Sequence, residues 1–356
     1  MTSDRFFLTM PYLLIHIGII VTYFILRNRR DYISTRTAQF FAFINFLILL
    51  IFVGFRYEVG GDWVGYRRIF YPYKVHVFNG ATDPLFVGLM YISSLFRHAI
   101  SYQVLIFLMA AFFLIPIYWY FSCTKKNPIA YCGYVSLSFP FLIPLFGLGY
   151  LRQGISSSFS LFIWESFKKK NLPLCVLYCL IATGFHKSGL IFFIFPLILI
   201  YKRISLSYKR AFLVSAGSVF SLTLLAAAIF WAKAYIDSFL ISKGVLFRVS
   251  YALILVYSLY KSNFLRFLKR YPFYIVLGLI LFLCANLFIS TIIDRIILYG
   301  IMILFAEVAL SELKTRSLLL LSSVAFLYLF GWLNFSTWAT MGWIPYKSYL
   351  LEVFHW

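Results

Sequence analysis

Long apolar segments alternate with short polar segments along almost the whole chain. An α-helix needs about 17–25 mainly apolar residues to cross the hydrocarbon core of a membrane, and somewhat shorter runs also occur. Twelve runs approach or reach this length: 12–26, 38–55, 101–121, 129–146, 150–167, 171–185, 189–201, 212–232, 246–260, 272–291, 294–310 and 317–335. The pattern predicts an all-α polytopic membrane protein with about 12 transmembrane helices, in the range 11–13.

The segment 84–96 is a thirteenth apolar stretch, and the distribution of Lys and Arg decides how it is placed. Cytoplasmic loops of membrane proteins carry an excess of Lys and Arg. With the loop 27–36 in the cytoplasm, alternation of twelve spans puts the later basic clusters on the same side. A full span at 84–96 would move those clusters outside. We therefore expect 84–96 to lie at the interface or to re-enter the membrane, and both termini to be extracytoplasmic.

The composition excludes several classes of protein. Of the 356 residues, 63% are hydrophobic and only 12% are charged, with a mean hydropathy of +0.89. Soluble domains are about half apolar and a quarter charged. A large soluble catalytic domain, a disordered chain and a secreted disulfide framework are thus excluded. We expect one integral membrane domain, 1–356, in which 56–100 forms an extracytoplasmic loop plus the interfacial or re-entrant helix.

The formal charge of +21 is spread over short clusters between apolar runs rather than in a basic domain, so nucleic acid is not an expected partner. The predicted cytoplasmic side holds 19 basic and four acidic residues, a net of +15. The outward side holds the other 13 basic and seven acidic residues, a net of +6. Orientation and contacts with anionic lipid explain the cytoplasmic clusters. Candidate chemistry is therefore sought on the outward side.

Charged, aromatic and Gly residues are mixed at three points of that outward side. The stretch 56–68 leaves the second span with a Gly60-Gly61 pair that permits close backbone approach. Arg152-Gln153 begins the run 150–167, where a charge inside a membrane helix costs a few kcal/mol. The sequence His186-Lys187-Ser188-Gly189 interrupts an apolar run over 172–201. The competing interpretations are a solvated loop, snorkelling arginines and a structural His.

Three other features have simpler explanations. Asp83-Pro84 fits an N-cap followed by Pro at the first position of a helix. Asp294-Arg295 fits an interfacial ion pair. The aromatic tail 338–347 fits an interfacial belt, and equally a roof over a site. No Walker A, dinucleotide-binding, zinc-protease or nucleophile-elbow motif is present, nor an Asp-x-Asp pair for a divalent metal, so no cofactor or metal is expected.

Taken in order, these motifs resemble the EpsG family of Wzy-type polymerases of O-antigens and of capsular or exopolysaccharides. The resemblance covers essentially the whole chain, and each motif is weak on its own. Two departures are Asp83, where the family usually has Glu, and Gly189, where Ala is common. The motifs are Arg-Tyr-x-x-Gly-x-Asp-Trp-x-x-Tyr (Arg56 to Tyr66), Asp-Pro-x-Phe (Asp83 to Phe86), Arg-Gln-x-Ile (Arg152 to Ile155), Phe-His-x-Ser (Phe185 to Ser188), Asp294-Arg295 and Pro-Tyr-Lys (Pro345 to Lys347).

The resemblance implies a GT-C-like glycosyltransferase of the bacterial inner membrane. Such an enzyme joins undecaprenyl-diphosphate-linked oligosaccharide units, as donor and acceptor, at an active site that faces the periplasm. It is expected to work beside a chain-length regulator. Two alternatives stay open: a flippase for lipid-linked oligosaccharide, and a GT-C enzyme that adds a single sugar.

The expected reaction is attack of a sugar hydroxyl on an anomeric carbon, with loss of a lipid diphosphate. Without a metal, the leaving diphosphate must be stabilised by Arg and Lys side chains. We assign this role first to Arg152, and the role of general base to His186 or Asp62. The expected substrate-binding residues are Arg56, Tyr66, Asp83, Gln153, Lys187, Ser188, Arg295, Tyr346 and Lys347.

Overall fold

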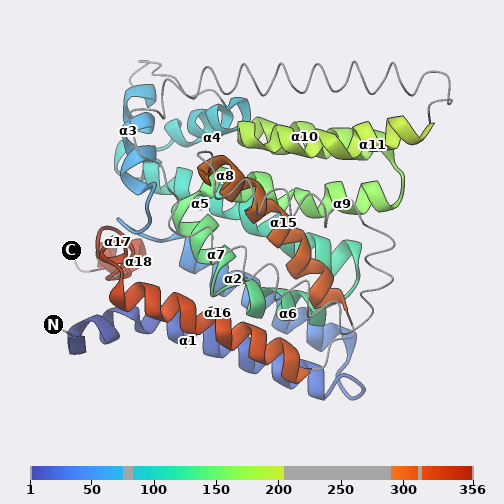
Figure 1. The fold of residues 1–356 in the computed structure, drawn as a ribbon. Helices are drawn as coiled ribbons and strands as arrows, with labels where there is room; N and C mark the ends of the chain where they lie inside the picture. The colour runs from blue at the N-terminus through green and yellow to red at the C-terminus, as the bar shows by residue number, and fades with distance from the viewer. Residues whose placement is uncertain (1, 75–82, 204–289, 312–314, 355–356) are drawn as a thin grey trace.

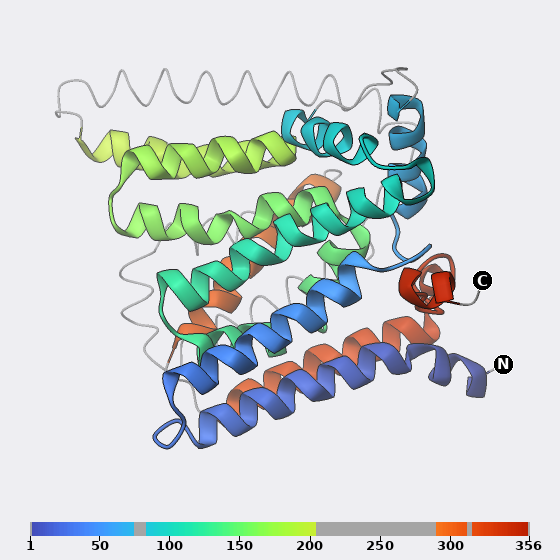
Figure 2. The same ribbon diagram turned by 180° about the vertical axis from the view of Figure 1, so that it is seen from behind.

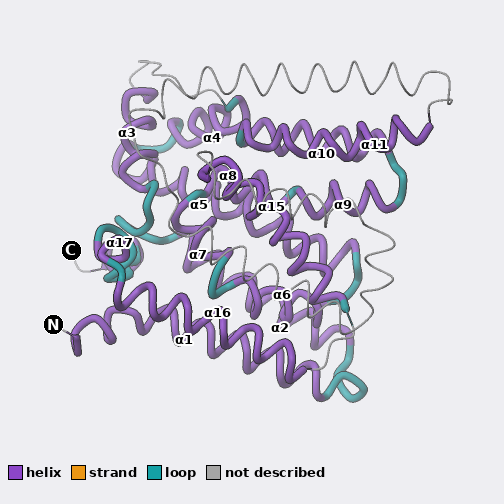
Figure 3. The backbone as a smooth tube through the Cα atoms, in the orientation of Figure 1, coloured by secondary structure: helices purple, strands orange, loops and turns teal. Residues whose placement is uncertain are grey.

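The computed structural model describes residues 2–74, 83–203, 290–311 and 315–354, and within these ranges the chain is helical (Figures 1 and 3). One isolated β-bridge, between Arg56 and Ser348, is the exception there. The helices are α1 (Thr2–Asn28), α2 (Thr35–Gly54), α3 (Trp63–Lys74), α4 (Pro84–Ser94), α5 (His98–Trp119), η1 (Tyr120–Thr124), α6 (Pro128–Ser138), α7 (Leu142–Pro144), η2 (Leu145–Gly149), α8 (Leu151–Ser158), α9 (Ser160–Lys168), α10 (Leu172–Phe185), η3 (Lys187–Phe193), α11 (Ile194–Arg203), α15 (Ser290–Leu310), α16 (Thr315–Phe335), α17 (Thr337–Thr340) and α18 (Tyr349–Phe354).

Four of the predicted apolar runs form helices that are long and apolar enough to cross a membrane. These helices are Phe7–Asn28, Thr35–Gly54, His98–Thr124 and Ser317–Phe335. The protein is therefore all-helical in its described part, apart from that bridge, and its candidate spans are consistent with a membrane protein. The predicted runs 212–232 and 246–260, and nearly all of 272–291, lie outside the described residues. The total of about 12 spans stays a prediction.

The predicted run 129–146 is not one straight helix. α6 and the segment Leu142–Gly149 meet at an angle of 79°. Pro140 lies in this break and has no N–H to donate to the carbonyl of Ser136, four residues earlier. The hydroxyl of Ser322, from α16, donates to that carbonyl instead. The break is thus built into the packing of α6 against α16.

The helices pack as one bundle, with α8 near its centre. α1 and α16 lie side by side along one edge, and α10 and α11 lie along the opposite edge (Figures 1 and 2). α8 contacts α5, α10 and α15 and is almost entirely buried, although it carries three consecutive serines at 156–158. Ser157 and Ser158 donate to carbonyls three residues earlier, so their burial is compensated within the helix.

The charged residues of the described part gather at the two ends of the bundle. The described parts of the predicted cytoplasmic loops meet at one end, where the carboxylate of Glu165 binds Lys125 and Lys169, and Glu307 binds Lys168. The opposite end carries the segments around 56–68, 83–86, 150–153 and 342–349, together with α3, α17 and α18 (Figure 1).

Candidate active site

Two segments far apart in the sequence are joined at this second end of the bundle. The N–H of Tyr57 donates to the carbonyl of Lys347 over 3.0 Å, and the N–H of Tyr349 donates to Phe55 over 2.6 Å. The N–H of Gly60 donates to Gly342 over 2.5 Å. The predicted tail therefore lies against the chain that leaves α2. It covers the beginning of the polar stretch 56–68 that the sequence singles out.

Gly60 makes this arrangement possible. Its φ of 107° lies in a region that residues with a side chain rarely adopt. A Cβ at this position would stand 1.7 Å from the carbonyl oxygen of Leu148 and 2.6 Å from Nη1 of Arg56. The close backbone approach that the Gly pair predicts is thus found at Gly60, against the carbonyl of Leu148. Gly61 has open space around it.

Arg56 is completely buried beneath this contact. Its Nη1 donates to the carbonyl of Leu148, which lies within the π-helical turn η2, and its guanidinium lies 5.8 Å from the ring centre of Trp63. Its Nε and Nη2 have no hydrogen-bond partner within the described residues. Burial lowers the pKa of Arg56, while Tyr102, Tyr66, Asp62 and Tyr346 raise it. Arg stays protonated in proteins, so this is a buried cation.

The tail residues contact the same region in different ways. The hydroxyl of Tyr346 donates to the carbonyl of Phe52 over 2.6 Å, and its ring stacks on the ring of Phe52. Nζ of Lys347 lies 3.2 Å from the carboxylate of Glu58, and both side chains are about two-fifths exposed. Tyr346 therefore holds the tail in place, whereas Lys347 is accessible from outside.

Arg152 and Asp83 form an ion pair beside this cluster. Nη1 of Arg152 lies 2.7 Å from Oδ2 of Asp83. The other carboxylate oxygen of Asp83 accepts the backbone N–H of Lys187 over 3.2 Å. The guanidinium also lies over the rings of Phe86, at 4.9 Å, and Tyr66, at 5.4 Å. Asp83 thus connects two of the polar points found in the sequence, at 152 and at 186–189.

Burial sets the electrostatics of this pair. Only 5% of the Asp83 side chain is exposed, against 24% for Arg152. Burial raises the pKa of the Asp83 carboxyl, and the neighbouring Arg152 and the N–H of Lys187 counteract that rise. The cation therefore keeps an accessible surface while the anion that orients it is buried. Such a guanidinium can still receive a ligand.

α3 supplies one wall of the site. Its buried residues Trp63, Tyr66 and Phe70 recur at helical spacing, so one face of the helix packs inward. The hydroxyl of Tyr66 accepts the backbone N–H of Arg152 over 3.3 Å, and the hydroxyl of Tyr102 donates to the carbonyl of Trp63 over 2.6 Å. The apolar pattern predicts no helix here. The spacing of the three aromatic residues is the signal that would have revealed it.

His186 ends α10 and belongs to a network of hydroxyl groups. Its Nδ1 accepts the backbone N–H of Ser188 over 3.2 Å and also contacts the hydroxyl of Ser188. The Ser188 hydroxyl contacts that of Tyr299, which donates to Ser156 over 3.4 Å. Since Nδ1 accepts an N–H, the proton of a neutral His186 lies on Nε2. The break in the apolar run places this ring, because the 3₁₀ helix η3 follows it directly.

A profile of known sequences now identifies the family. The EpsG family profile matches residues 39–348. The chain belongs to the EpsG family. This confirms the resemblance found in the motifs, and the family is one of exopolysaccharide and Wzy-type polymerases. No curated protein and no solved structure matches the chain significantly.

All the predicted site residues lie within the part that matches the EpsG family, and most of them are brought to one end of the bundle. One group surrounds the Arg152–Asp83 pair and includes Tyr66, the Lys187 backbone and, through it, His186 and Ser188. The second group surrounds Arg56. The two groups adjoin because Leu148, which binds Arg56, and Arg152 lie four residues apart.

Three predicted residues make none of the contacts described above through a hydrogen bond or an ion pair in the described part. Gln153 is buried, and Asp62 is half-buried just before α3. The side chain of Arg295 lies outside the described residues, although its backbone belongs to α15. Tyr299, one turn further along α15, was not predicted, because nothing in an apolar run distinguishes a Tyr that binds other hydroxyls from one that packs. Within the described residues, no group of His, Cys, Asp and Glu is arranged to hold a metal ion.

Proposed function

We propose that this EpsG-family protein is a polysaccharide polymerase that joins lipid-diphosphate-linked oligosaccharide units. The observation that carries the proposal is the accessible guanidinium of Arg152, fixed by the buried carboxylate of Asp83 beside His186. A reaction that expels a diphosphate needs a preorganised cation at the point where negative charge develops. Family membership and this geometry therefore support the same chemistry.

Arg152 would stabilise the leaving diphosphate. One of its nitrogens is held by Asp83, and the exposed part of the guanidinium can bind phosphate oxygens. A donor of this kind typically contributes about 3–4 kcal/mol to the transition state. Asp83 would act as a positioning residue for Arg152 rather than as a ligand of the sugar. Arg56, which is completely buried, would fix the adjoining loop and add positive potential.

His186 would accept the proton of the attacking sugar hydroxyl. The basic nitrogen of a neutral His186 is Nδ1, which accepts the Ser188 N–H and lies beside the Ser188 hydroxyl. We infer that Ser188 takes the proton of the sugar hydroxyl and passes its own proton to Nδ1. The new bond forms between that sugar oxygen and the anomeric carbon, and the bond from this carbon to the diphosphate breaks. Tyr299 would orient Ser188. Asp62 is the second candidate base.

The remaining features of the proposal concern the membrane. We place the protein in the bacterial inner membrane with about 12 spans, a GT-C-like arrangement and both termini outside. The segment 56–100 would be an extracytoplasmic loop with α4 as its interfacial or re-entrant helix, since the 11 residues of α4 are too few to cross. The site would face the periplasm. Its substrates would be undecaprenyl-diphosphate-linked units, with Tyr66, Gln153, Lys187, Arg295 and Lys347 among the groups that bind them, and a chain-length regulator would act beside it.

The distribution of charge favours an enzyme over a flippase. A flippase for a charged lipid needs polar groups through the depth of the membrane. In the described part of the chain, the charged side chains of Lys, Arg, Asp and Glu lie at the two ends of the bundle, and the interior contains apolar groups, hydroxyls, the imidazole of His16 and the amide of Asn45. A localised anion site at one end is what a transferase needs.

The test is a substitution at Arg152 in a strain that lacks the native protein. Arg152→Ala should abolish long chains and leave single repeat units, with at least a 10²-fold loss of elongation rate, because one preorganised donor is removed. Gels measure the chain length of the product, and immunoblots of the membrane fraction measure the level of the protein. Arg68→Ala is the matched control, since Arg68 is exposed on α3 and outside the site.

Two results would contradict the proposal. Normal ladders from Arg152→Ala at normal protein level would remove Arg152 from the reaction. If deletion of the protein left no repeat unit on the cell surface, it would be a flippase. Purified wild-type protein with lipid-diphosphate repeat units decides the third case, because an enzyme that adds one sugar makes no ladder.

A further inference from the structure

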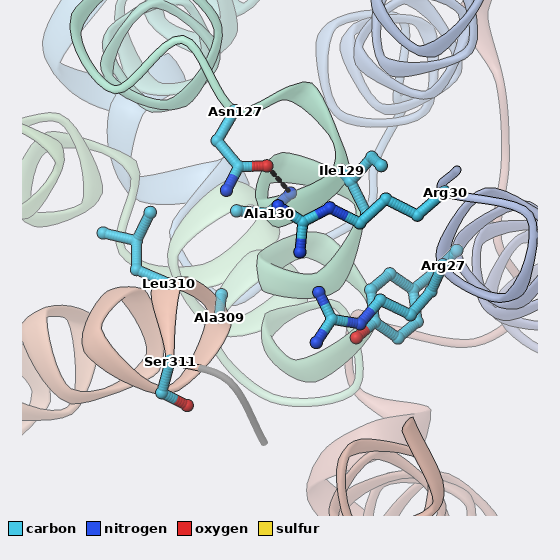
Figure 4. A pocket seen from close by; sticks show the side chains of 9 residues that line it. Arg27, Arg30, Asn127, Ile129, Ala130, Ala309, Leu310 and Ser311 are labelled. Carbon is cyan, nitrogen blue, oxygen red and sulfur yellow. Dashed lines mark hydrogen bonds between the residues drawn. The ribbon is translucent and has the colours of Figure 1, made fainter. Parts of the chain in front are cut away.

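A cavity of about 200 Å³ lies at the opposite end of the bundle, at the predicted cytoplasmic side (Figure 4). It is formed where α1 ends, α6 begins and α15 ends. Nothing in the proposed reaction uses it. The residues that line it are Tyr23, Arg27, Arg30, Asn127, Ile129, Ala130, Ala309, Leu310 and Ser311.

The lining is rich in hydrogen-bond donors and has no carboxylate. Arg27 and Arg30 lie one helical turn apart, and both guanidinium groups point into the cavity in Figure 4. Within the described residues, neither of them makes an ion pair or a hydrogen bond. Three basic residues at the same end, Lys125, Lys168 and Lys169, are paired with carboxylates instead.

The amide of Asn127 is oriented by the start of α6. Its Oδ1 accepts the N–H of Ala130 over 3.0 Å, as an N-cap does. Because the N–H of Ala130 needs an acceptor, the amide atom that it contacts is the oxygen. The other amide atom, Nδ2, is then the one left for the cavity (Figure 4). The N-terminus of α6 adds a partial positive charge on the same side. Two guanidiniums, an amide N–H₂ and a helix N-terminus thus converge on one small space.

The size and chemistry of the cavity select its ligand. Sites for drug-sized molecules occupy about 300–1,000 Å³, so this cavity is too small for an oligosaccharide. Fork-shaped guanidinium groups match the oxygens of a phosphate. We propose that the cavity binds a single phosphate group, carried by an anionic phospholipid headgroup or by a soluble phosphate. Basic pockets between helices on the cytoplasmic side of membranes are suited to such headgroups.

The experiment measures the thermal unfolding midpoint of the purified full-length protein in a neutral detergent. Phosphatidylglycerol, phosphatidylcholine and inorganic phosphate are added separately. Phosphatidylglycerol should raise the midpoint of the wild type, and its apparent affinity should fall at least about tenfold in Arg27→Ala/Arg30→Ala, because two charge-assisted contacts are lost. The control Arg29→Ala/Arg36→Ala removes the same charge from the same loop, from exposed positions outside the cavity, and should respond as the wild type does.

A second variant separates binding from folding. Asn127→Asp keeps the helix cap, and a carboxylate at a helix N-terminus is stabilising. The same carboxylate repels a phosphate and pairs with the two arginines. This variant should unfold at or above the wild-type midpoint without ligand and show a smaller shift with it. An effect of inorganic phosphate equal to that of phosphatidylglycerol would identify a soluble ligand, whereas an effect of the lipid alone would identify a headgroup.

The proposal is wrong if both double variants lose the response to the same extent, since loop charge alone would then explain it. It is also wrong if phosphatidylcholine protects as well as phosphatidylglycerol while inorganic phosphate has no effect, or if Asn127→Asp responds fully. None of these results depends on the polymerase reaction.

Discussion

At the scale of single residues, Gly60 determines how the tail meets the loop after α2. Replacing it with Ala would put a methyl group 1.7 Å from the Leu148 carbonyl, in a backbone conformation that Ala avoids. We expect Gly60→Ala to cost about 2–4 kcal/mol of unfolding free energy, from backbone strain and the lost Arg56 contact. Gly61→Ala should stay within about 0.5 kcal/mol, since that position is open. Denaturation of the two purified variants measures the difference, and equal stability would refute this role.

Asp83 makes the activity dependent on pH in a defined direction. Arg152 is oriented only while the carboxyl of Asp83 is ionised. Because burial raises the pKa of that carboxyl above its usual 3.8, protonation occurs at a higher pH than for an exposed Asp. Elongation by the wild type should therefore fall on the acid side at a higher pH than an exposed Asp would impose.

The control for this prediction is a pair of substitutions. Asp83→Asn should lower elongation at neutral pH about tenfold or more, because the charge-assisted bond is lost, and should leave only the acid limb that protonation of the base His186 imposes. Asp83→Glu keeps the charge and should retain the limb. The pH profile of purified enzyme measures both. An unchanged acid limb in Asp83→Asn would assign that limb to another group.

Single residues also show how far the sequence predicts the site. Arg152, Asp83 and His186 stand out in the sequence because placing a charged or ionisable group beside an apolar run costs free energy, so such a group usually has a function. Their mutual contacts could not be predicted, since the ion pair joins residues 69 positions apart. Tyr299 could not be predicted at all. A tyrosine within an apolar run has the same pattern whether its hydroxyl is used or not.

At the scale of elements, the break between α6 and α7 is stabilised from outside the helix. The carbonyl of Ser136 loses its helical donor to Pro140 and takes the hydroxyl of Ser322. Ser322→Ala should leave that buried carbonyl without a partner and cost about 1–3 kcal/mol. The neighbouring Ser323 is exposed, so Ser323→Ala should change stability by less than about 0.5 kcal/mol. Thermal unfolding of both variants tests this, and equal midpoints would show that the break needs no such donor.

The helices that the sequence predicts best are those in which a long run is uniformly apolar. The runs 38–55 and 101–121 are long and uniformly apolar, and they appear as α2 and α5. The break at Pro140 was missed, because hydropathy does not register the loss of one N–H. α3 was missed for a related reason, since a short amphipathic helix at a polar end has no long apolar run.

At the scale of the whole molecule, the segregation of charge to two ends can be tested directly. In a variant without native cysteines, Arg68→Cys and Lys169→Cys each place one exposed thiol at opposite ends of the bundle. If the charge bias sets the orientation, a membrane-impermeant maleimide should label the first in intact spheroplasts and the second only after lysis. Gel-shift detection measures labelling. Labelling of both in intact cells, or the reverse pattern, would contradict the proposed sidedness.

The contact between the chain after α2 and the tail 338–347 has a consequence for biosynthesis. Tyr346 follows Phe52, the residue it binds, by 294 positions. At about 5–20 residues per second, a ribosome needs roughly 15–60 s to make that interval. During this time the membrane already holds α2 with Arg56 at its end, and the partner that covers Arg56 does not yet exist. The site is therefore completed only when a segment translated 294 positions after Phe52 has been made, and a nascent enzyme in the membrane would stay inactive until then.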